Sequence, residues 1–409
     1  MTLPEKVPLL PGWLFLLAML TALSPLSVDL YLPAFPVIAS QLQVSSSEVQ
    51  ITLAVFLLGM AFGQLIYGPL SDLYGRKPPL YAGLTLFFIA SIGCAFAADL
   101  TTLTAARFCQ ALGGGAGVVI SRAVIRDRTS TVQAARAFSM LMLMLGLGPI
   151  LAPLAGGALL LAVGWRGIFM TLAACGLALL LGVHFCMRET SPSLSNGSKP
   201  KLRSAFNQYL SLACDWKFMR FVLVGALPFG GMFAYVSGSP KIIIDLYGIQ
   251  PNHFGWFFGL NAFGMIVGSQ LNAKLVARYG PATLLKYVLL APAIATLMAT
   301  LSTWAGTINL SQLMLCFFIY MTSMGLLTPN AVALAMASQG HRAGSASSVI
   351  GFIQFLFGTL AVGIVSLWMS PSALPVITVM LGLSAASLLL HRISQPNAPG
   401  QITEQFGKS

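Results

Sequence analysis

Apolar runs of about 20 residues recur along the whole chain, and they constrain its fold more than any single motif does. A helix of that length spans the hydrocarbon core of a bilayer. Only 8% of the residues are charged and the mean hydropathy is +0.84. Soluble domains carry about 25% charged residues. The chain is therefore expected to be an all-α integral membrane protein.

The positions of these runs predict twelve membrane-spanning helices. They cover residues 11–38, 48–71, 79–98, 101–123, 134–160, 164–187, 218–239, 252–276, 283–304, 308–336, 343–369 and 372–392. The first run is preceded by Lys6 and has some features of a signal peptide. We expect it to be a membrane helix, because further apolar segments follow it rather than an exported soluble domain.

The basic residues predict the orientation of the chain. The formal net charge is +12, and all but three of the 22 Lys and Arg fall on one side of the predicted segments. The exceptions are Arg107, inside a segment, and Arg166 and Lys241, on the other side. Positive charge collects on the cytoplasmic side of membrane proteins, so both termini and the central loop are expected there. This distribution favours contact with anionic lipid headgroups over a nucleic-acid partner.

A polar stretch divides the segments six and six. We predict an N-terminal six-helix bundle at 1–187, a cytoplasmic linker at 188–217, a C-terminal six-helix bundle at 218–395 and a cytoplasmic tail at 396–409. Within the linker, a short amphipathic helix on the membrane is expected at about 202–212.

An internal repeat links the two bundles. Six residues near the second segment of the first bundle recur at a constant spacing in the second bundle: Gly59, Met60, Gly63, Leu70, Tyr74 and Gly75 become Gly264, Met265, Gly268, Leu275, Tyr279 and Gly280. A duplicated six-helix unit suits a transporter whose halves rock against each other around a site near the midplane.

Asp29 is the acid that constrains function most. It lies within the first predicted segment, with apolar sequence on both sides, whereas the other nine acids lie at segment ends or in polar connections. A carboxylate at the bilayer centre costs about 2.5–3.5 kcal/mol on insertion scales, and such residues usually handle ions, protons or cations. The alternative is a structural hydrogen bond, or a side chain that reaches the outer interface.

Arg107 is the only cation well inside a predicted segment. Burial disfavours a charged carboxylate and a nearby arginine favours it, so Arg107 is the natural modulator of Asp29. The alternative role for Arg107 is a core ion pair or a set of backbone hydrogen bonds.

The turn at 68–78 concentrates charge between the second and third segments. Gly75 is expected to end the second helix, and Asp72 to pair with an arginine on a neighbouring helix or with the exposed N-terminal amides of another helix. Such a cluster can latch two helix bundles in one state and release them in another; otherwise it is a helix end with topology-setting charges. The candidate latch residues are Gly68, Asp72, Gly75, Arg76 and Lys77.

Glycines and prolines interrupt the fifth segment. Prolines remove helix hydrogen bonds, and small residues let helices approach closely. The pattern consists of Gly146, Gly148, Pro149, Pro153, Gly156 and Gly157. It predicts either a packing kink or an element that couples the motions of the two bundles.

The wall of a substrate cavity is predicted from polar and aromatic residues inside segments. Aromatic walls with few polar groups suit amphiphilic compounds, although each such residue also fits plain helix packing. The candidates, besides Asp29, are Tyr31, Phe56, Phe233, Tyr235, Asn261, Asn330, Gln354 and Phe357.

Motifs for enzyme chemistry are missing from the sequence. The six cysteines are scattered with no CxxC pair, the four histidines form no ligand-spaced cluster, and there is no phosphate loop or HExxH pattern. We therefore expect no enzyme, no metal site and no cofactor.

The motifs resemble those of the major facilitator superfamily. Residues 68–78 resemble its motif A, 107–113 its motif B, with Ala111 at the usual Gly position, and 146–157 its motif C, with the closing glycines displaced. Five stretches of the chain resemble the bicyclomycin/chloramphenicol resistance (Bcr/CflA) family: residues 27–36, 107–113, 149–157, 164–166 and 227–235.

The resemblance implies two pseudo-symmetric six-helix bundles and drug–proton antiport through the bacterial inner membrane. Asp29 is then the expected proton carrier, with substrate and proton competing as the halves alternate. The expected substrates are small amphiphiles of the chloramphenicol or bicyclomycin class, or else cysteine-related metabolites or small peptides. The proton gradient supplies the energy, lipids surround the protein, and a monomer is expected. A metabolite importer and a membrane enzyme or channel remain further alternatives.

Overall fold

The computed structural model describes residues 12–128, 131–190, 202–339, 342–368, 370 and 372–394, and this part of the chain is helical with no strand. The first half comprises α1 (Gly12–Asp29), η1 (Leu32–Ala34), α2 (Phe35–Gln41), α3 (Ser46–Tyr74), α4 (Lys77–Ala95), α5 (Leu100–Arg128) and α6 (Thr131–Cys186). Helix α8 (Leu202–Cys214) lies in the linker. The second half comprises α9 (Trp216–Pro240), η2 (Lys241–Leu246), α10 (Phe254–Tyr279), α11 (Pro281–Val288), α12 (Leu290–Trp304), α13 (Leu310–Met336), α14 (Ala343–Leu367) and α15 (Leu374–Ile393). The predicted tail at 396–409 lies outside the described residues, as does 191–201 of the predicted linker.

The first predicted segment is broken rather than continuous. Helix α1 ends at Asp29, and the chain passes through the short 3-10 turn η1 before α2 begins. Proline causes the break, because Pro33 has no N–H to donate to the Asp29 carbonyl and Pro36 has none for Leu32. Asp29 therefore lies at a helix end inside the protein, not in the middle of an uninterrupted helix as its surrounding sequence suggests.

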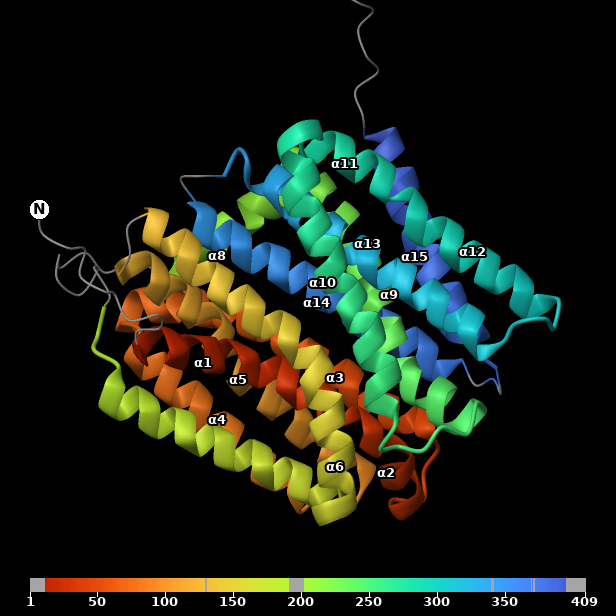
Figure 1. Cartoon of the computed structure of the whole chain (residues 1–409). Helices are drawn as coiled ribbons and strands as arrows, with labels where there is room; N and C mark the ends of the chain where they lie inside the picture. Colours follow the sequence, from red (N-terminus) through yellow and green to blue (C-terminus); the bar gives the residue numbers. More distant parts are fainter. Residues whose placement is uncertain are drawn as a thin grey trace, which may run out of the picture.

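The number of membrane crossings depends on a kink within α6 and on helix α10. Ten stretches of the described residues are helical, long and apolar enough to cross a membrane. One of them, Gly146–Cys186, contains two crossings, because Gly164 interrupts α6 with φ 69° and ψ 177°, a conformation that favours glycine. Figure 1 shows the chain reversing there. Helix α10, which is not among the ten, runs along α6 and α13, so the bundle has the twelve crossings that the sequence predicts.

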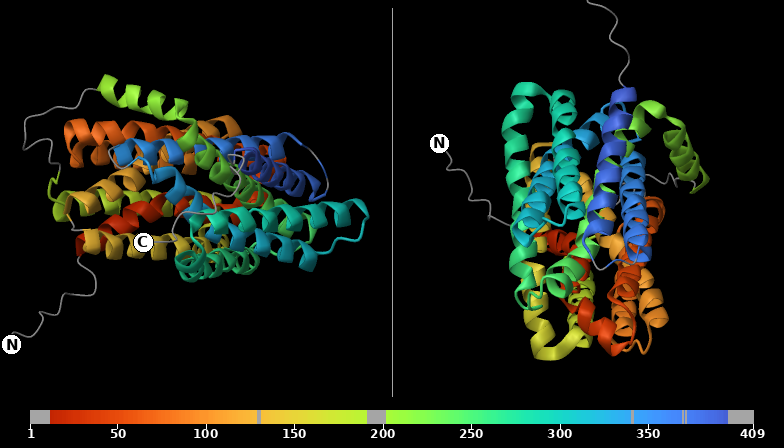
Figure 2. Two further views of the ribbon diagram at one scale, coloured as in Figure 1. Left: turned by 90° about the horizontal axis from the view of Figure 1, so that it is seen from above. Right: turned by 90° about the vertical axis from the view of Figure 1, so that its right-hand side faces the viewer.

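The two halves form two neighbouring groups of helices. Helices α1 to α6, red to yellow, lie together, and α9 to α15, green to blue, lie beside them in both Figure 1 and the right-hand view of Figure 2. The repeat appears in the backbone: Gly75 and Gly280 follow α3 and α10 with similar positive φ angles of 90° and 72°. Gly59 packs closely against α5, and Gly264 packs closely against α13.

The halves meet along two seams, one between α3 and α14 and one between α6 and α10. We call the end of the bundle that carries Arg76, Arg188 and Arg342 the basic end, and the end that carries Asp99 and Lys241 the opposite end.

The two halves contact each other near both ends of the bundle. At the opposite end, the Ser46 hydroxyl donates to Asp245 Oδ2 at 2.9 Å, and Lys241 Nζ donates to Ser47 Oγ at 3.0 Å. At the basic end, α3 packs against both α14 and α8. Helix α8, yellow-green, lies on the outside of the bundle in both views of Figure 2.

Candidate functional site

Asp29 is buried between the halves, with 5% of its surface exposed. The hydrogen bonds and ion pairs within the described part of the chain include none to its carboxylate. It lies close enough to the Tyr235 phenol of α9 for the two groups to interact electrostatically. The acid of the first half therefore faces a polar group of the second half.

Arg107 is fully buried on α5 and is held by ring faces. Its guanidinium lies 4.1 Å from the Phe56 ring centroid, 4.7 Å from that of Tyr31 and 5.7 Å from that of Phe169. One terminal nitrogen donates to the Ser27 carbonyl at 3.1 Å and to a Gln110 oxygen at 2.6 Å. Ring quadrupoles and two acceptors thus stabilise a cation in an apolar core.

The sequence suggested that Asp29 and Arg107 approach each other, and the ion pairs of the described residues include none between them. The structural reason is that Arg107 reaches the carbonyl of Ser27, while Asp29 sits at the helix end beyond it. Nε and one terminal nitrogen of Arg107 are buried and have no hydrogen-bond partner in the structure. Those two nitrogens are unused donors next to the helix that carries the acid.

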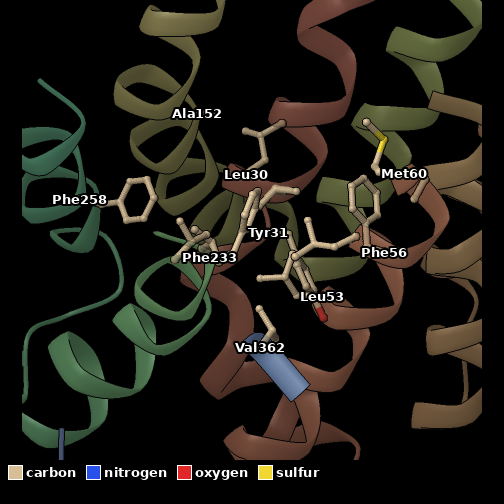
Figure 3. Close-up of a cluster of buried hydrophobic side chains, with 14 of the residues drawn as sticks. Leu30, Tyr31, Leu53, Phe56, Met60, Ala152, Phe233, Phe258 and Val362 are labelled. Atoms are coloured by element: carbon tan, nitrogen blue, oxygen red, sulfur yellow. The ribbon is translucent and has the colours of Figure 1, made fainter. Parts of the chain in front are cut away.

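Several of the predicted cavity residues converge where the halves meet. In Figure 3, Tyr31 of the first half lies at the centre of the cluster, with Phe56 of the same half on one side and Phe233 and Phe258 of the second half on the other. The Tyr31 hydroxyl hydrogen-bonds the Thr52 hydroxyl at 2.8 Å. These rings belong to one continuous hydrophobic cluster that spans both halves, so the centre of the molecule is aromatic.

Tyr235 and Asn261 supply the polar groups of the second half. The Asn261 amide donates to the Tyr235 hydroxyl at 2.9 Å, and Asn261 Oδ1 is buried without a partner in the structure. Tyr235 is stacked on Phe258 with centroids 5.6 Å apart and lies 4.6 Å from Phe317. A buried acceptor with no donor is costly, and it is a natural contact for a bound molecule.

The other predicted cavity residues are placed differently. Asn330 donates to Asn272 at 2.6 Å between α13 and α10, so it holds two helices of the second half together. Gln354 and Phe357 are half-buried on α14, and the Phe357 carbonyl lies against Gly230 of α9. The structure therefore does not place Asn330 with the central rings.

The charged turn is organised around Arg76, which is 3% exposed. It pairs with Asp72 in its own turn at 2.6 Å and with Asp127 at the end of α5 at 2.8 Å. The Glu189 carboxylate accepts from the backbone N–H groups of Arg76 at 2.8 Å and Lys77 at 3.0 Å, at the start of α4. The sequence predicted an arginine partner for Asp72 on a neighbouring helix, whereas the structure pairs it with Arg76, four residues later in the same turn. The prediction did not include Asp127 and Glu189, although their position among basic residues at two helix ends was the available signal.

The glycines of the fifth segment lie next to the acid. A Cβ on Gly156 would overlap the Leu30 carbonyl, so α6 touches α1 one residue after Asp29. Gly157 packs against Asn252 of the second half, with a built Cβ 3.1 Å from its Cα. Nothing lies within 4 Å of the Cβ position of Gly148. The close approaches therefore depend on Gly156 and Gly157, and they connect the break after Asp29 with the seam between α6 and α10.

Metal chemistry has no candidate site within the described residues, which contain no group of three or more His, Cys, Asp or Glu that could hold a metal ion.

Comparisons with known proteins agree with this architecture. Residues 17–362 match the family model of the Major Facilitator Superfamily. The chain is 39% identical to the uncharacterized MFS-type transporter YdgK of Bacillus subtilis over 349 residues, which is 85% of this chain and 86% of that protein. It is 32% identical to the bicyclomycin resistance protein homolog of Haemophilus influenzae, covering 92% and 94% of the two chains. It is 29% identical to the multidrug resistance protein MdtL of Escherichia coli O17:K52:H18, covering 95% and 96%.

Solved transporters share the fold. The crystal structure of a D-xylose-proton symporter matches with a TM-score of 0.71 at 15% identity, covering 95% of this chain and 99% of that chain. A bacterial homolog of the lysosomal transporter Spinster, in an inward-facing and occupied conformation, matches at 0.67 and 16%, covering 93% and 94%. The resemblance to the bicyclomycin resistance branch agrees with the Haemophilus relative. The protein is a multi-pass membrane transporter rather than an enzyme, and it belongs to the major facilitator superfamily.

Proposed function

We propose that this transporter exports small amphiphilic compounds, of the chloramphenicol or bicyclomycin class, from the bacterial cytoplasm in exchange for protons. The observation that carries the proposal is Asp29, a buried acid at a helix break between the halves with no cation bonded to it. Two relatives, a bicyclomycin resistance protein homolog and a multidrug resistance protein, support the substrate class.

Asp29 is proposed to carry the proton because its burial links protonation to closure. A buried carboxylate costs several kcal/mol of free energy unless it is protonated or paired with a cation. Each time the halves close around Asp29, a proton or a cationic group must therefore accompany it. When the site opens to either side of the membrane, water solvates the carboxylate and the proton can leave. Exchange also requires that substrate and proton compete, so that the halves close with one or the other bound.

Arg107 is proposed to set when Asp29 gives up its proton. Its two unpartnered nitrogens are donors that a deprotonated Asp29 can reach once α1 moves relative to α5. Phe56 and Tyr31 hold the guanidinium in place meanwhile. A cation that is fixed by rings, and not by a permanent carboxylate partner, remains available to a transient one.

The proposed substrate site lies between the aromatic groups of the two halves. Tyr31 and Phe56 on one side and Phe233 on the other form an apolar wall that suits a flat, weakly polar molecule. The side-chain amide oxygen of Asn261 (Oδ1) and the Tyr235 hydroxyl offer polar contacts in otherwise apolar surroundings. The same polar pair also suits an amide or amine, which makes a cysteine-related metabolite or small peptide the second candidate substrate.

The orientation is proposed from charge. The basic end carries most of the Lys and Arg residues and faces the cytoplasm by the positive-inside rule, with both termini on that side. The opposite end, closed by the Ser46–Asp245 and Ser47–Lys241 hydrogen bonds, then faces the periplasm.

Transport in liposomes tests the proposal. Purified protein is reconstituted with an imposed pH gradient, and radiolabelled chloramphenicol is followed for the wild type, Asp29→Asn and the exposed control Asp99→Asn. We expect uphill drug movement in the wild type and the control, and none in Asp29→Asn. Gradient-driven movement by Asp29→Asn at the wild-type rate contradicts the carrier role. Movement by none of the three directs the assay to cysteine-related compounds and small peptides.

A further inference from the structure

A backbone carbonyl in α3 has lost its helical partner. Within a helix, the carbonyl of residue 65 accepts from the N–H of residue 69, and residue 69 is a proline inside α3. Pro69 has no N–H, so the Leu65 carbonyl needs a hydrogen-bond donor from elsewhere or stays unpaired in an apolar environment. This carbonyl lies more than two helical turns before the end of α3 at Tyr74.

The linker helix supplies the missing donor. The Tyr209 hydroxyl of α8 donates to the Leu65 carbonyl at 3.1 Å. Tyr209 and Ser348 of α14 both approach Gly68, with their hydroxyl oxygens 3.5 Å and 3.3 Å from the position of a Cβ built there. Helices α3, α8 and α14 therefore meet at one point of the seam between the halves.

The rest of α8 is fixed to the second half. Ser345 at the start of α14 donates to Gln208 at 2.8 Å, and Arg342 donates to Ser211 at 2.8 Å. Leu212 of α8 is fully buried in a hydrophobic cluster with residues of α9, α13 and α14. Helix α8 thus moves with the second half and contacts the first half through Tyr209.

The outer face of α8 is apolar. Phe206 and Leu210, one helical turn apart, are 68% and 58% exposed. No acidic residue occurs between Glu189 and Asp215 in the sequence, whereas basic residues do. This face suits the boundary between acyl chains and anionic headgroups.

We propose that α8 is a strap that holds the basic ends of α3 and α14 together, with the Tyr209–Leu65 hydrogen bond as its releasable contact. Access from the basic end requires α3 and α14 to separate there, and the strap opposes that separation. The proposal rests on alternating access in the proposed function but not on proton coupling or on any substrate. Pro69 is central to it, because it creates the acceptor that Tyr209 occupies.

Distance measurements between spin labels test the strap without substrate or gradient. Labels are placed at Tyr74 and Gly344, at the basic ends of α3 and α14, after the native cysteines are replaced, and the protein is studied in lipid nanodiscs. We expect Tyr209→Phe to raise the ratio of separated to closed seams about two- to ten-fold, as the loss of one hydrogen bond predicts. Tyr287→Phe, at an exposed tyrosine of the second half, is the matched control and leaves the ratio unchanged.

A double mutant separates the hydrogen bond from simple packing. Pro69→Ala restores an N–H to the Leu65 carbonyl, so Tyr209→Phe is expected to have a much smaller effect in that background. An unchanged distance distribution in Tyr209→Phe overturns the proposal, and so does an effect of equal size with and without Pro69. Because no transport is measured, a failed strap is distinguishable from a failed antiporter.

Discussion

The first half of the molecule places a guanidinium where the second half places a phenyl ring. Gly63 lies against the Leu112 carbonyl in the first half, and Gly268 lies against the Thr322 carbonyl in the second. Arg107 precedes Leu112 by five residues, and Phe317 precedes Thr322 by five residues. Arg107 in the first half therefore corresponds to Phe317 in the second.

Two tyrosines, one just after α1 and one in α9, support the correspondence. Tyr31 lies 4.7 Å from the guanidinium of Arg107, and Tyr235 lies 4.6 Å from the ring of Phe317. Aligning these tyrosines also matches Asp29 with Phe233, two residues earlier. The duplicated scaffold therefore kept its packing while charge was confined to one half. In the proposed function, the first half handles the proton and the second half supplies an apolar wall.

Replacing Asp29 is expected to have the largest effect of the substitutions that test this difference between the halves. Asp29→Asn is expected to abolish proton-driven transport, because an amide cannot carry a proton between the two sides. Phe233→Leu at the matching position keeps the apolar wall and is expected to change the rate only a few-fold. Proton release on drug addition, recorded with a pH-sensitive dye inside liposomes, measures both. Equal losses in the two variants contradict the division of roles between the halves.

Replacing the buried cation Arg107 is expected to have the second largest effect on transport. Arg107→Lys keeps the charge but loses the planar stacking on Phe56 and Tyr31, and we expect transport to fall at least about ten-fold at normal expression. Phe317→Leu in the second half keeps an apolar side chain at the matching position and is the control. Its smaller side chain is expected to lower stability through a cavity but to change transport much less than Arg107→Lys does. A lysine variant that transports at the wild-type rate shows that charge alone suffices.

The charged turn has no counterpart after α10, where Pro281 follows Gly280. Arg76→Ala leaves Asp127, which is 5% exposed, without its cation, and removing one partner of a buried pair costs about 3–5 kcal/mol. We expect a lower unfolding temperature in detergent and slower turnover. Arg76→Met combined with Asp127→Leu is expected to regain much of the stability, and a double variant less stable than Arg76→Ala excludes this explanation.

Much of the fold was predictable from local patterns, because a bilayer demands a long apolar run for every crossing. The twelve crossings and the linker helix follow from such runs. The sequence did not predict that α1 ends at Asp29, although Pro33 and Pro36 were the signal. A helix end inside the protein depends on α6 packing against the break through Gly156, which is a long-range contact.

The site was only partly predictable, for a similar reason. Residue type and position within a segment singled out Asp29 and Arg107, because charge is rare in the membrane. They could not show that Arg107 is held by three rings, one from the turn after α1 and one each from α3 and α6. Asn330 was grouped with the cavity by type alone, whereas it bonds to Asn272 away from the central rings.

Glycine packing gives a smaller, reversed difference between the halves. A Cβ on Gly268 would overlap the Thr322 carbonyl, which is backbone and cannot rotate away, whereas a Cβ on Gly63 would meet the Gly115 Cα at 3.3 Å. We expect Gly268→Ala to cost about 1–3 kcal/mol of stability. Gly63→Ala is expected to be close to neutral, because the helix propensity gained by alanine offsets the tight contact. Thermal unfolding in detergent ranks them, and the opposite order refutes the packing argument.

The smallest expected difference concerns the caps of two matching helices. Asp99 caps α5, where its carboxylate accepts from the Thr102 backbone N–H at 2.8 Å and from the Thr102 hydroxyl at 2.9 Å. Asn309 caps α13 in the same way, accepting from the Gln312 N–H at 2.9 Å. The first cap titrates and the second does not. The hydrogen bonds from Thr102, with the backbone one first, lower the pKa of Asp99.

A lowered pKa means that the folded state favours the charged cap, so its stabilising contribution is present near neutral pH and is lost as the pH falls through the folded-state pKa. That loss lies below about pH 4, since the ordinary aspartate pKa is about 3.9. Asp99→Asn makes the first cap resemble the second and removes its pH-dependent contribution to stability. We expect the variant and the wild type to unfold at similar temperatures at pH 7. Between pH 7 and pH 3, the unfolding temperature of the wild type is expected to fall further than that of the variant. Asn309→Asp is the reciprocal variant and is expected to introduce the same acid sensitivity into the second half. If the pH dependence of unfolding stays the same in both variants, the two caps do not differ in the way their chemistry predicts.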